Sequence, residues 1–180
     1  MGNGPGGLED YYDCMQRHPQ LIGLFVWEWC DHAIAVPQAG QAEPAYRYGG
    51  DFGDYPHFGN FCMDGLVYPD RTLHTGLLEH KQVFRPVRLI DFDLQAHRAC
   101  FRNDYAFLNL AEAFYLRVEA YNREGLLLTS KDCATWQAEP GQTTWVDLAC
   151  CGDLASVASV RFVYLGLENE GEYGFDQVSL

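Results

Sequence analysis

The residues best suited to chemistry lie in the segment FVWEWCDH, from Phe25 to His32, which contains two tryptophans and two acids. An indole face can stack on the apolar C–H face of a sugar ring. The carboxylates of Glu28 and Asp31 could form a pair for acid/base catalysis. The alternative is that both tryptophans belong to a hydrophobic core and that both acids bind loop amides. The residue types alone leave these two interpretations open.

A second group of polar residues lies in the loop segment NFCMDGLVYPDR, from Asn60 to Arg71. Asp64 precedes a turn glycine, Gly65. A loop carboxylate together with nearby backbone carbonyls suits a hard cation. The alternative is an Asx-type turn with an ion pair between Asp70 and Arg71.

Two helices and one buried strand would have to position these residues. The pattern predicts a helix over 6–19 and a second one over 74–84. The segment LIGLFVWEWC (21–30) is continuously apolar and rich in β-forming residues, which predicts a strand buried on both faces of a parallel sheet. Ligands bind at the carboxyl ends of such strands. The strand needs parallel neighbours that this part of the sequence lacks, so we expect residues 1–84 to be part of a larger α/β fold.

After Phe84 the hydrophobic pattern changes to a period of two. Seven short strand-like segments, separated by turn-forming residues, predict an antiparallel β-sandwich of the immunoglobulin-like type. We place the domain boundary between Phe84 and Arg85. The predicted strands are VRLIDFDL, CFRNDYAF, FYLRVEAYN, GLLLTSKDC, TTWVDL, SVRFVYLGL and YGFDQVSL.

Composition restricts the class of protein further. The chain has 180 residues, of which 48% are hydrophobic and 14% aromatic, which excludes a disordered chain. The net charge of −13 argues against binding to nucleic acid or to anionic membranes. The seven cysteines are odd in number and scattered, and the sequence starts without the features of a signal peptide. We therefore expect reduced thiols and a cytoplasmic location.

The order and spacing of several motifs resemble the β-galactosidases of glycoside hydrolase family 2. The resemblance implies that residues 1–84 are the C-terminal part of a (β/α)8 TIM-barrel catalytic domain and that residues 85–180 are an immunoglobulin-like antiparallel β-sandwich. Residues 21–30 would then be the eighth barrel strand, and the loop over 31–72 would lie over the active site. The motifs are MGNGPGGLEDYY, GLFVWEWCDHAI, YGGDFGD, NFCMDGLVYPDRTLHTGLLEHKQVFRPVR and GEYGFDQVSL.

The resemblance also implies a mechanism and a set of site residues. The family retains anomeric configuration by using a glutamate nucleophile and a glutamate acid/base. The nucleophile motif ends in M-G-N, which matches Met1–Asn3. We therefore expect neither catalytic glutamate in this chain, and we expect the isolated chain to be inactive. Trp27 matches the tryptophan that lines the galactose subsite. Phe61 matches a residue whose backbone carbonyl binds Na+, and Asp64 matches a side-chain ligand of that ion which also contacts the sugar.

The implied partners follow from the same resemblance. They are a terminal β-D-galactoside such as lactose, together with the remainder of a β-galactosidase polypeptide or a complementary subunit. The sodium site in this chain would be partial, and the Mg2+ ligands of the family would lie outside it. A second hypothesis is that the chain is a non-catalytic β-sandwich accessory module that binds carbohydrate or a protein.

Overall fold

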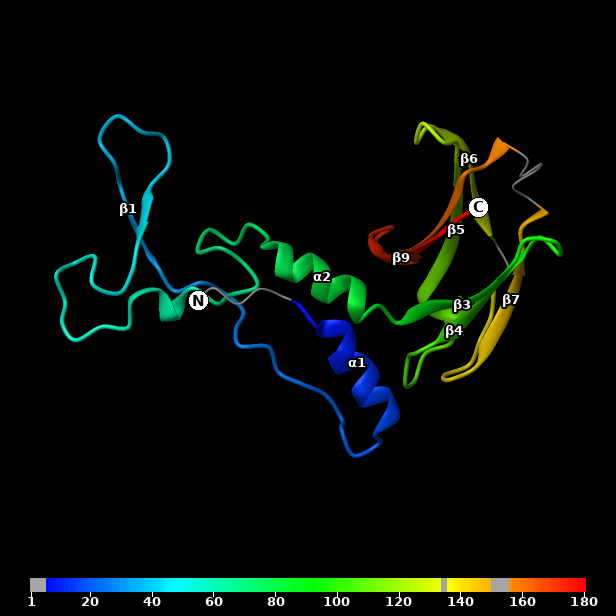
Figure 1. Cartoon of the computed structure of the whole chain (residues 1–180), viewed down its shortest axis with the longest axis horizontal. Coiled ribbons are helices and arrows are strands. Elements are labelled where there is room, and N and C mark those ends of the chain that lie inside the picture. The colour runs from blue at the N-terminus through cyan, green and yellow to red at the C-terminus, as the bar shows by residue number, and fades with distance from the viewer. Residues whose placement is uncertain (1–5, 134–135, 150–155) are drawn as a thin grey trace. The chain divides into compact units, whose positions relative to one another are not determined.

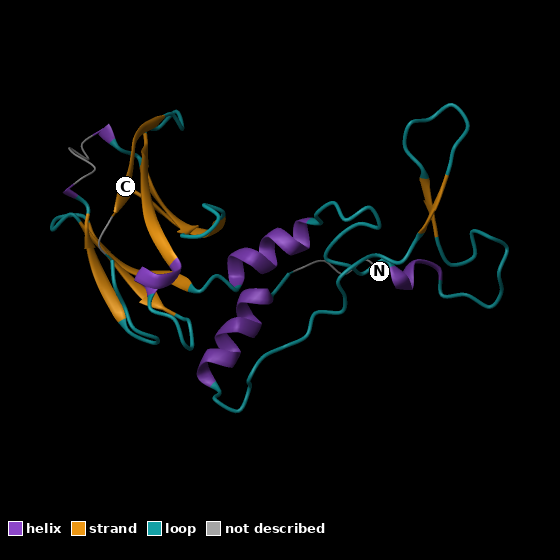
Figure 2. Cartoon of the chain, turned by 180° about the vertical axis from the view of Figure 1, so that it is seen from behind, coloured by secondary structure: helices purple, strands orange, loops and turns teal. Residues whose placement is uncertain are grey.

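A computed structural model of the chain describes residues 6–133, 136–149 and 156–180. The chain divides into two compact units, Met1–Phe84 and Arg85–Leu180. Helices α1 and α2 belong to the first unit, and the two larger sheets belong to the second (Figures 1 and 2). Cys150 and Cys151 lie outside the described residues.

The first unit contains both helices that the sequence predicts. Helix α1 (Leu8–Arg17) follows Gly7, whose φ of 77° is the left-handed conformation that glycine adopts readily. Helix α2 spans Thr75–Val83. The helices contact each other where Tyr12 meets Phe84 edge to face at 5.9 Å. A short antiparallel pair, β1 (Ile34–Val36) and β2 (Ala45–Arg47), and the 3-10 helix η1 (Gly59–Cys62) lie between them in sequence.

The strand predicted over 21–30 is not formed in this chain. Residues 21–29 have no strand assignment, and Cys30 makes only an isolated parallel bridge to Val67. Ile22 and Phe25 are fully exposed. A strand that is apolar on both faces needs hydrogen-bonded neighbours and covering layers. The described residues of the first unit supply neither, and they form no closed barrel.

The second unit consists of two antiparallel sheets that share one core. One sheet has the order β3-β4-β7 and the other has the order β6-β5-β8-β9. Each of the seven strands overlaps one predicted segment, although β4 ends at Asn103 and leaves residues 104–107 of the predicted segment outside the strand. The two sheets are compatible with the predicted β-sandwich. The strands are β3 (Val87–Asp93), β4 (Arg98–Asn103), β5 (Phe114–Tyr121), β6 (Leu127–Cys133), β7 (Thr143–Asp147), β8 (Ser159–Gly166) and β9 (Glu172–Ser179), and the helical turn α3 (Leu110–Ala113) precedes β5.

Aromatic side chains from both sheets fill the centre of this core. Phe101 on β4 lies edge to face with Phe162 on β8 at 5.2 Å and with Trp136 at 5.8 Å. Trp136 also stacks on Tyr164. The buried indole Nε1–H of Trp136 donates a hydrogen bond of 2.9 Å to the carbonyl of Phe114. This bond explains how the core accepts a polar N–H group.

Trp136→Phe is expected to lower the free energy of unfolding by about 1–3 kcal/mol, because the Phe114 carbonyl loses its donor and the smaller ring leaves a cavity. Urea denaturation of the full chain measures this change. Trp145→Phe is the matched control, since Trp145 is partly exposed on β7. Equal effects of the two substitutions would contradict the role given to the buried Nε1–H.

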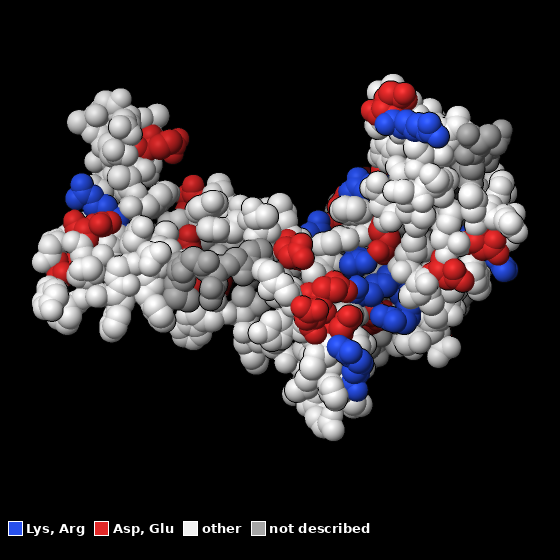
Figure 3. All heavy atoms as spheres, viewed as in Figure 1, with Lys and Arg blue, Asp and Glu red and all other residues white. Residues whose placement is uncertain are grey.

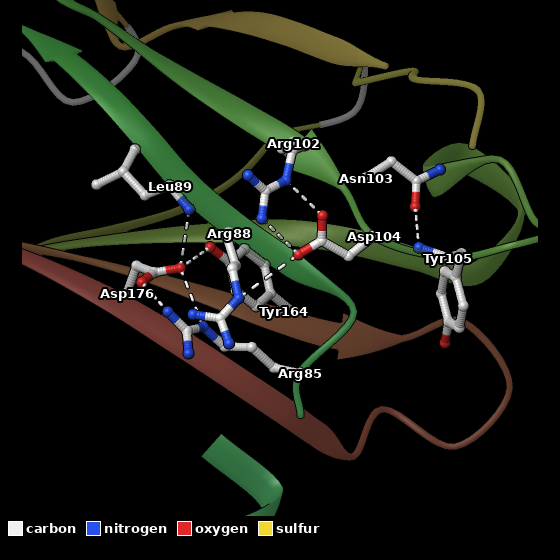
Figure 4. Close-up of polar contacts among 9 residues, drawn as sticks. All are labelled: Arg85, Arg88, Leu89, Arg102, Asn103, Asp104, Tyr105, Tyr164 and Asp176. Atoms are coloured by element: carbon white, nitrogen blue, oxygen red, sulfur yellow. Dashed lines mark hydrogen bonds and ion pairs between the residues drawn. The ribbon is translucent and has the colours of Figure 1, made fainter. Parts of the chain in front are cut away.

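An ion cluster joins the first strand of the second unit to the last one. Asp176 on β9 accepts hydrogen bonds from Arg85, from the backbone N–H of Leu89 and from the hydroxyl of Tyr164. Figure 4 shows these groups converging on one carboxylate. Next to it, Asp104 pairs with Arg102 in a bidentate contact and with Arg88 at 3.5 Å.

Candidate functional site

The two segments that the sequence singles out lie side by side in the first unit. Residues 28–32 and residues 62–67 are joined by backbone hydrogen bonds of 2.9–3.1 Å. Two of them come from the loop, since the N–H groups of Leu66 and Val67 donate to the carbonyls of Glu28 and Trp29. The other three run in the opposite direction, from Glu28 N–H to the Asp64 carbonyl, from Asp31 N–H to the Val67 carbonyl and from His32 N–H to the Cys62 carbonyl.

Gly65 permits this close approach. A Cβ atom at Gly65 would lie 2.2 Å from the backbone nitrogen of Asp31 and 2.4 Å from the carbonyl carbon of Cys30. Both neighbours are backbone atoms, so a larger residue could fit only if the two segments moved apart. The sequence predicts a turn glycine here, whereas the structure uses it for backbone-to-backbone contact.

The two acids of the FVWEWCDH segment have different surroundings. Asp31 is only 3% exposed, and its Oδ1 accepts the N–H of Gly65 at 2.8 Å while its Oδ2 lies 2.8 Å from His74 Nε2. Asp31 therefore binds a loop amide, which is one of the two interpretations that the sequence leaves open. Glu28 Oε1 lies 3.5 Å from Nε2 of His32, four residues further along the chain.

The two tryptophans of this segment are not part of a core. Trp27 is 78% exposed and Trp29 is 60% exposed. An exposed indole offers a flat apolar face that suits stacking on a sugar ring. The described residues therefore place neither indole in a core, just as they leave Ile22 and Phe25 of the same segment exposed.

Asp64 and Phe61 lie close together in sequence, on the loop that is hydrogen-bonded to the segment 28–32. The Asp64 carbonyl accepts the N–H of Glu28, so the backbone of Asp64 lies beside the peptide that follows Trp27. The Oδ1 atom of Asp64 is buried and has no hydrogen-bond partner. A buried carboxylate oxygen without a donor is costly unless a cation or water meets it. Asp64 therefore suits the role of a cation ligand. Phe61 lies three residues before Asp64, within the 3-10 helix η1, and its side chain is 61% exposed.

Within the described residues there is no group of three or more His, Cys, Asp or Glu side chains that could hold a metal ion together. A cation at Asp64 would thus depend on backbone carbonyls and on ligands from elsewhere, which is a coordination that suits Na+ better than a transition metal. Hard cations accept such oxygen ligands.

The rest of the loop is organised by its own carboxylates. Asp51 Oδ2 accepts the N–H of Tyr48 at 2.9 Å, and both oxygens of Asp54 lie 3.2 Å from the N–H of Gly50. This hydrogen bond from Gly50 is the main reason that the pKa of Asp54 lies below its ordinary value. Asp70 accepts both the N–H and the hydroxyl of Thr72, which is the Asx-type turn that the sequence leaves open at this position.

Two cavities flank the segment 28–33. One has a volume of about 360 Å3 and the other about 620 Å3, and His32 and Ala33 line both. Neither is lined by Trp27, Phe61 or Asp64. The smaller is also lined by Glu28, Trp29, Cys30, Asp31, Pro69 and Arg71, and the larger by Ile34, Arg47, Tyr48, Gly49, Phe52, Asp54 and Cys62.

One pairing of this region gives no signal in the sequence. His74 pairs with Asp31 across 43 residues, and its ring stacks on Tyr68 with centroids 3.7 Å apart. No motif spacing links positions so far apart, so only the folded loop shows the pair.

The surface charge agrees with the composition. Asp and Glu side chains occur on both units, and in the second unit Lys and Arg side chains lie among them (Figure 3). Among the helices that the structure describes, none is both long and apolar enough to cross a bilayer.

Comparison with known proteins identifies the family that this chain resembles. The family model described as glycosyl hydrolases family 2, TIM barrel domain, matches residues 1–89. A β-galactosidase of Actinobacillus pleuropneumoniae is 48% identical over 132 residues, which is 72% of this chain and 12% of that protein. A β-galactosidase of Staphylococcus xylosus is 41% identical over 127 residues, which is 69% of this chain and 12% of that protein.

The chain thus spans about an eighth of the length of these curated relatives. Because 132 aligned residues exceed the length of the first unit, the similarity continues into the second unit. The family model covers the helices α1 and α2 together with the segments that carry Trp27 and Asp64. By this resemblance the chain is similar to a part of the β-galactosidases of glycoside hydrolase family 2.

Proposed function

We propose that this chain is a segment of a retaining β-galactosidase that hydrolyses terminal β-D-galactosides such as lactose. In this proposal the chain contributes part of the substrate pocket and part of a sodium site, and it contains neither catalytic glutamate. The observation that carries the proposal is the 48% identity to a β-galactosidase over 132 residues. The exposed indole of Trp27, beside the loop that carries Asp64, supports a sugar-binding role.

We further propose that residues 1–84 are the C-terminal part of a TIM-barrel catalytic domain and that residues 21–30 are its eighth strand. The exposed apolar side chains of Ile22 and Phe25 support this proposal, because exposed apolar groups in an unpaired segment mark a surface that another chain segment covers. The remainder of a β-galactosidase polypeptide, or a complementary subunit, would supply the neighbouring strands.

We propose an immunoglobulin-like topology for residues 85–180. In constant-type immunoglobulin domains the first, second, fourth and fifth strands form one sheet, and the third, sixth and seventh form the other. Here β3, β4 and β7 form one sheet and β5, β8 and β9 belong to the other, which is the same division for six of the seven strands. The fourth strand, β6, pairs with β5 instead.

The proposed cation is Na+, held by the Asp64 side chain and the Phe61 carbonyl. The buried, unpaired Oδ1 of Asp64 supports this assignment. When bound, the ion would supply positive charge that interacts with a sugar hydroxyl. The Mg2+ ligands of the family would lie outside this chain.

We also propose a cytoplasmic location, which is supported by the free thiols of Cys14, Cys30, Cys62, Cys100 and Cys133.

A chimera tests the proposed function. The matched segment of the Actinobacillus pleuropneumoniae β-galactosidase is replaced by the aligned residues of this chain, and hydrolysis of an aryl β-galactoside is measured. We expect an active chimera, and we expect the isolated 180-residue chain to show no hydrolysis above a buffer blank. A folded but inactive chimera, or an active isolated chain, would contradict the proposal. Lactose binding by the isolated chain together with an inactive chimera would favour the accessory module.

Asp64→Ala in the chimera is expected to raise the KM and the half-saturating Na+ concentration by about tenfold, because the cation loses a charged ligand. Asp64→Asn keeps an oxygen ligand and is expected to change both values less. The measurement is a set of steady-state rates over a range of NaCl concentrations at constant ionic strength. Identical Na+ dependence in the unaltered chimera and in Asp64→Ala would contradict the cation role.

A further inference from the structure

Asp31 and His74 form a pair for which the proposed function gives no role. Among the residues that the structure describes, Asp31 is the most deeply buried charged residue, with 3% of its surface exposed. Burying a carboxylate is costly unless its oxygens are hydrogen-bonded. Both oxygens have partners here. Oδ1 accepts the N–H of Gly65, and Oδ2 lies beside Nε2 of the His74 imidazole, each at 2.8 Å. The cost of burial suggests a specific task for this carboxylate.

One oxygen of Asp31 fixes the peptide that follows Asp64. Gly65 donates its N–H to Asp31 Oδ1, and the preceding carbonyl, that of Asp64, accepts the N–H of Glu28. The peptide group between Asp64 and Gly65 is therefore held at both its oxygen and its nitrogen. Both contacts come from the segment that carries Trp27.

The other oxygen of Asp31 connects this contact to helix α2. His74 directly precedes α2, and its backbone N–H donates to the Leu66 carbonyl at 3.1 Å. Its ring stacks on Tyr68 at an interplanar angle of 23°. His74 thus joins the start of a helix, the loop over 62–74 and the Asp31 carboxylate.

We propose that Asp31 and His74 are positioning residues that set the placement of Asp64 relative to Trp27. This proposal rests on the proposed function, since it assigns the pair to the galactoside and sodium pocket. Asp64 Oδ1 has no hydrogen bond of its own. The position of this oxygen therefore depends on how the backbone of Asp64 is held. Groups that orient a ligating side chain change affinity although they touch neither the ion nor the substrate.

The kinetic test uses three variants of the chimera. His74→Phe keeps a ring that can stack on Tyr68 but removes the hydrogen bond to Asp31. His74→Gln can restore an N–H donor near the position of Nε2. Asp70→Asn is the control, because this substitution weakens an exposed carboxylate contact of the same loop, in which Asp70 accepts hydrogen bonds from Thr72.

We expect His74→Phe to raise the KM and the half-saturating Na+ concentration by about tenfold, with a change in kcat of less than about twofold. His74→Gln should recover most of this loss, and Asp70→Asn should behave like the unaltered chimera. A purely structural role would lower thermal stability and leave the KM of the folded enzyme unchanged. An unchanged KM and Na+ response in folded His74→Phe would overturn the proposal.

Amide hydrogen exchange in the full 180-residue chain tests the same contact without any activity. Asp31→Ala should speed exchange of the Gly65 N–H by at least about tenfold, since a lost hydrogen bond lowers protection. Exchange of the Leu148 N–H, in the second unit, should be unchanged. Unaltered exchange at Gly65 would overturn the proposal even if the chimeras fail to fold. An inactive unaltered chimera would count against the proposed function, whereas the exchange result would still decide whether Asp31 holds Gly65.

Discussion

Asp176→Asn is expected to lower the free energy of unfolding of the second unit by about 3–5 kcal/mol, although the two side chains have nearly the same shape. The Asp176 carboxylate receives Arg85 Nη2 at 2.5 Å, Leu89 N–H at 3.0 Å and the Tyr164 hydroxyl at 2.5 Å. All of these groups are donors. An amide NH2 in place of one oxygen would therefore face a donor, and the charge of Arg85 would lose its partner.

Burial makes this cluster sensitive to the substitution. The side chains of Arg85 and Asp176 are only 10% and 15% exposed. Burial and the nearby Asp176 charge hold the pKa of Tyr164 well above its ordinary value, so its hydroxyl stays protonated and donates to Asp176 at neutral pH. Figure 4 shows that the cluster links β3 and β9, the first and last strands of the unit. Loss of the carboxylate would therefore weaken the contact between the two sheets.

The matched control for this prediction is Asp132→Asn. Asp132 makes a similar bidentate contact with Arg117, but the two side chains are 51% and 36% exposed. Exposed pairs of this kind contribute about 0–1 kcal/mol. Urea denaturation of the full chain compares the variants. Equal destabilisation by the two substitutions, or a loss below about 1 kcal/mol for Asp176→Asn, would contradict the account of the buried cluster.

Gly65→Ala is expected to lower kcat/KM of the chimera by about 100-fold, which corresponds to roughly 3 kcal/mol of overpacking. The added Cβ would lie 2.2 Å from the backbone nitrogen of Asp31 and within 2.7 Å of two backbone atoms of Cys30. Backbone atoms cannot turn aside as a side chain can. The two segments would have to separate, which would break the hydrogen bonds that place Asp64 beside Trp27.

Gly6→Ala is the control for this substitution, because a Cβ at Gly6 would meet no atom within 4 Å. Its kcat/KM should stay within about twofold of the unaltered chimera, as is typical of substitutions in open space. Steady-state rates of both variants give the comparison. A Gly65→Ala chimera with unaltered kcat/KM would show that the two segments need not approach closely.

Local patterns predict the elements whose partners are close in sequence or whose burial is one-sided. Helices α1 and α2 and the seven strands of the second unit are each recognisable from periodicity and from the turns between them. The segment 21–30 follows the same rules but forms no strand, since a strand buried on both faces depends on neighbours that the described residues do not provide.

The candidate site is predictable only in part, for a similar reason. Trp27 and Asp64 are found through motifs, because each belongs to a distinctive local sequence. The partners that hold them are distant in sequence. His74 pairs with Asp31 across 43 residues, and Gly65 fits only because of where Cys30 lies. Contacts of this kind depend on how the loop folds, which residue spacing does not encode.

The most direct test of the proposed role is a crystal structure of the chimera with a bound, unhydrolysed galactoside analogue in the presence of NaCl. We predict that the apolar face of the galactose ring lies against the Trp27 indole. We also predict a sodium ion coordinated by Asp64 Oδ1 and by the Phe61 carbonyl. A galactose ring bound away from Trp27, with no cation at Asp64, would contradict the assignment of this chain to the substrate pocket.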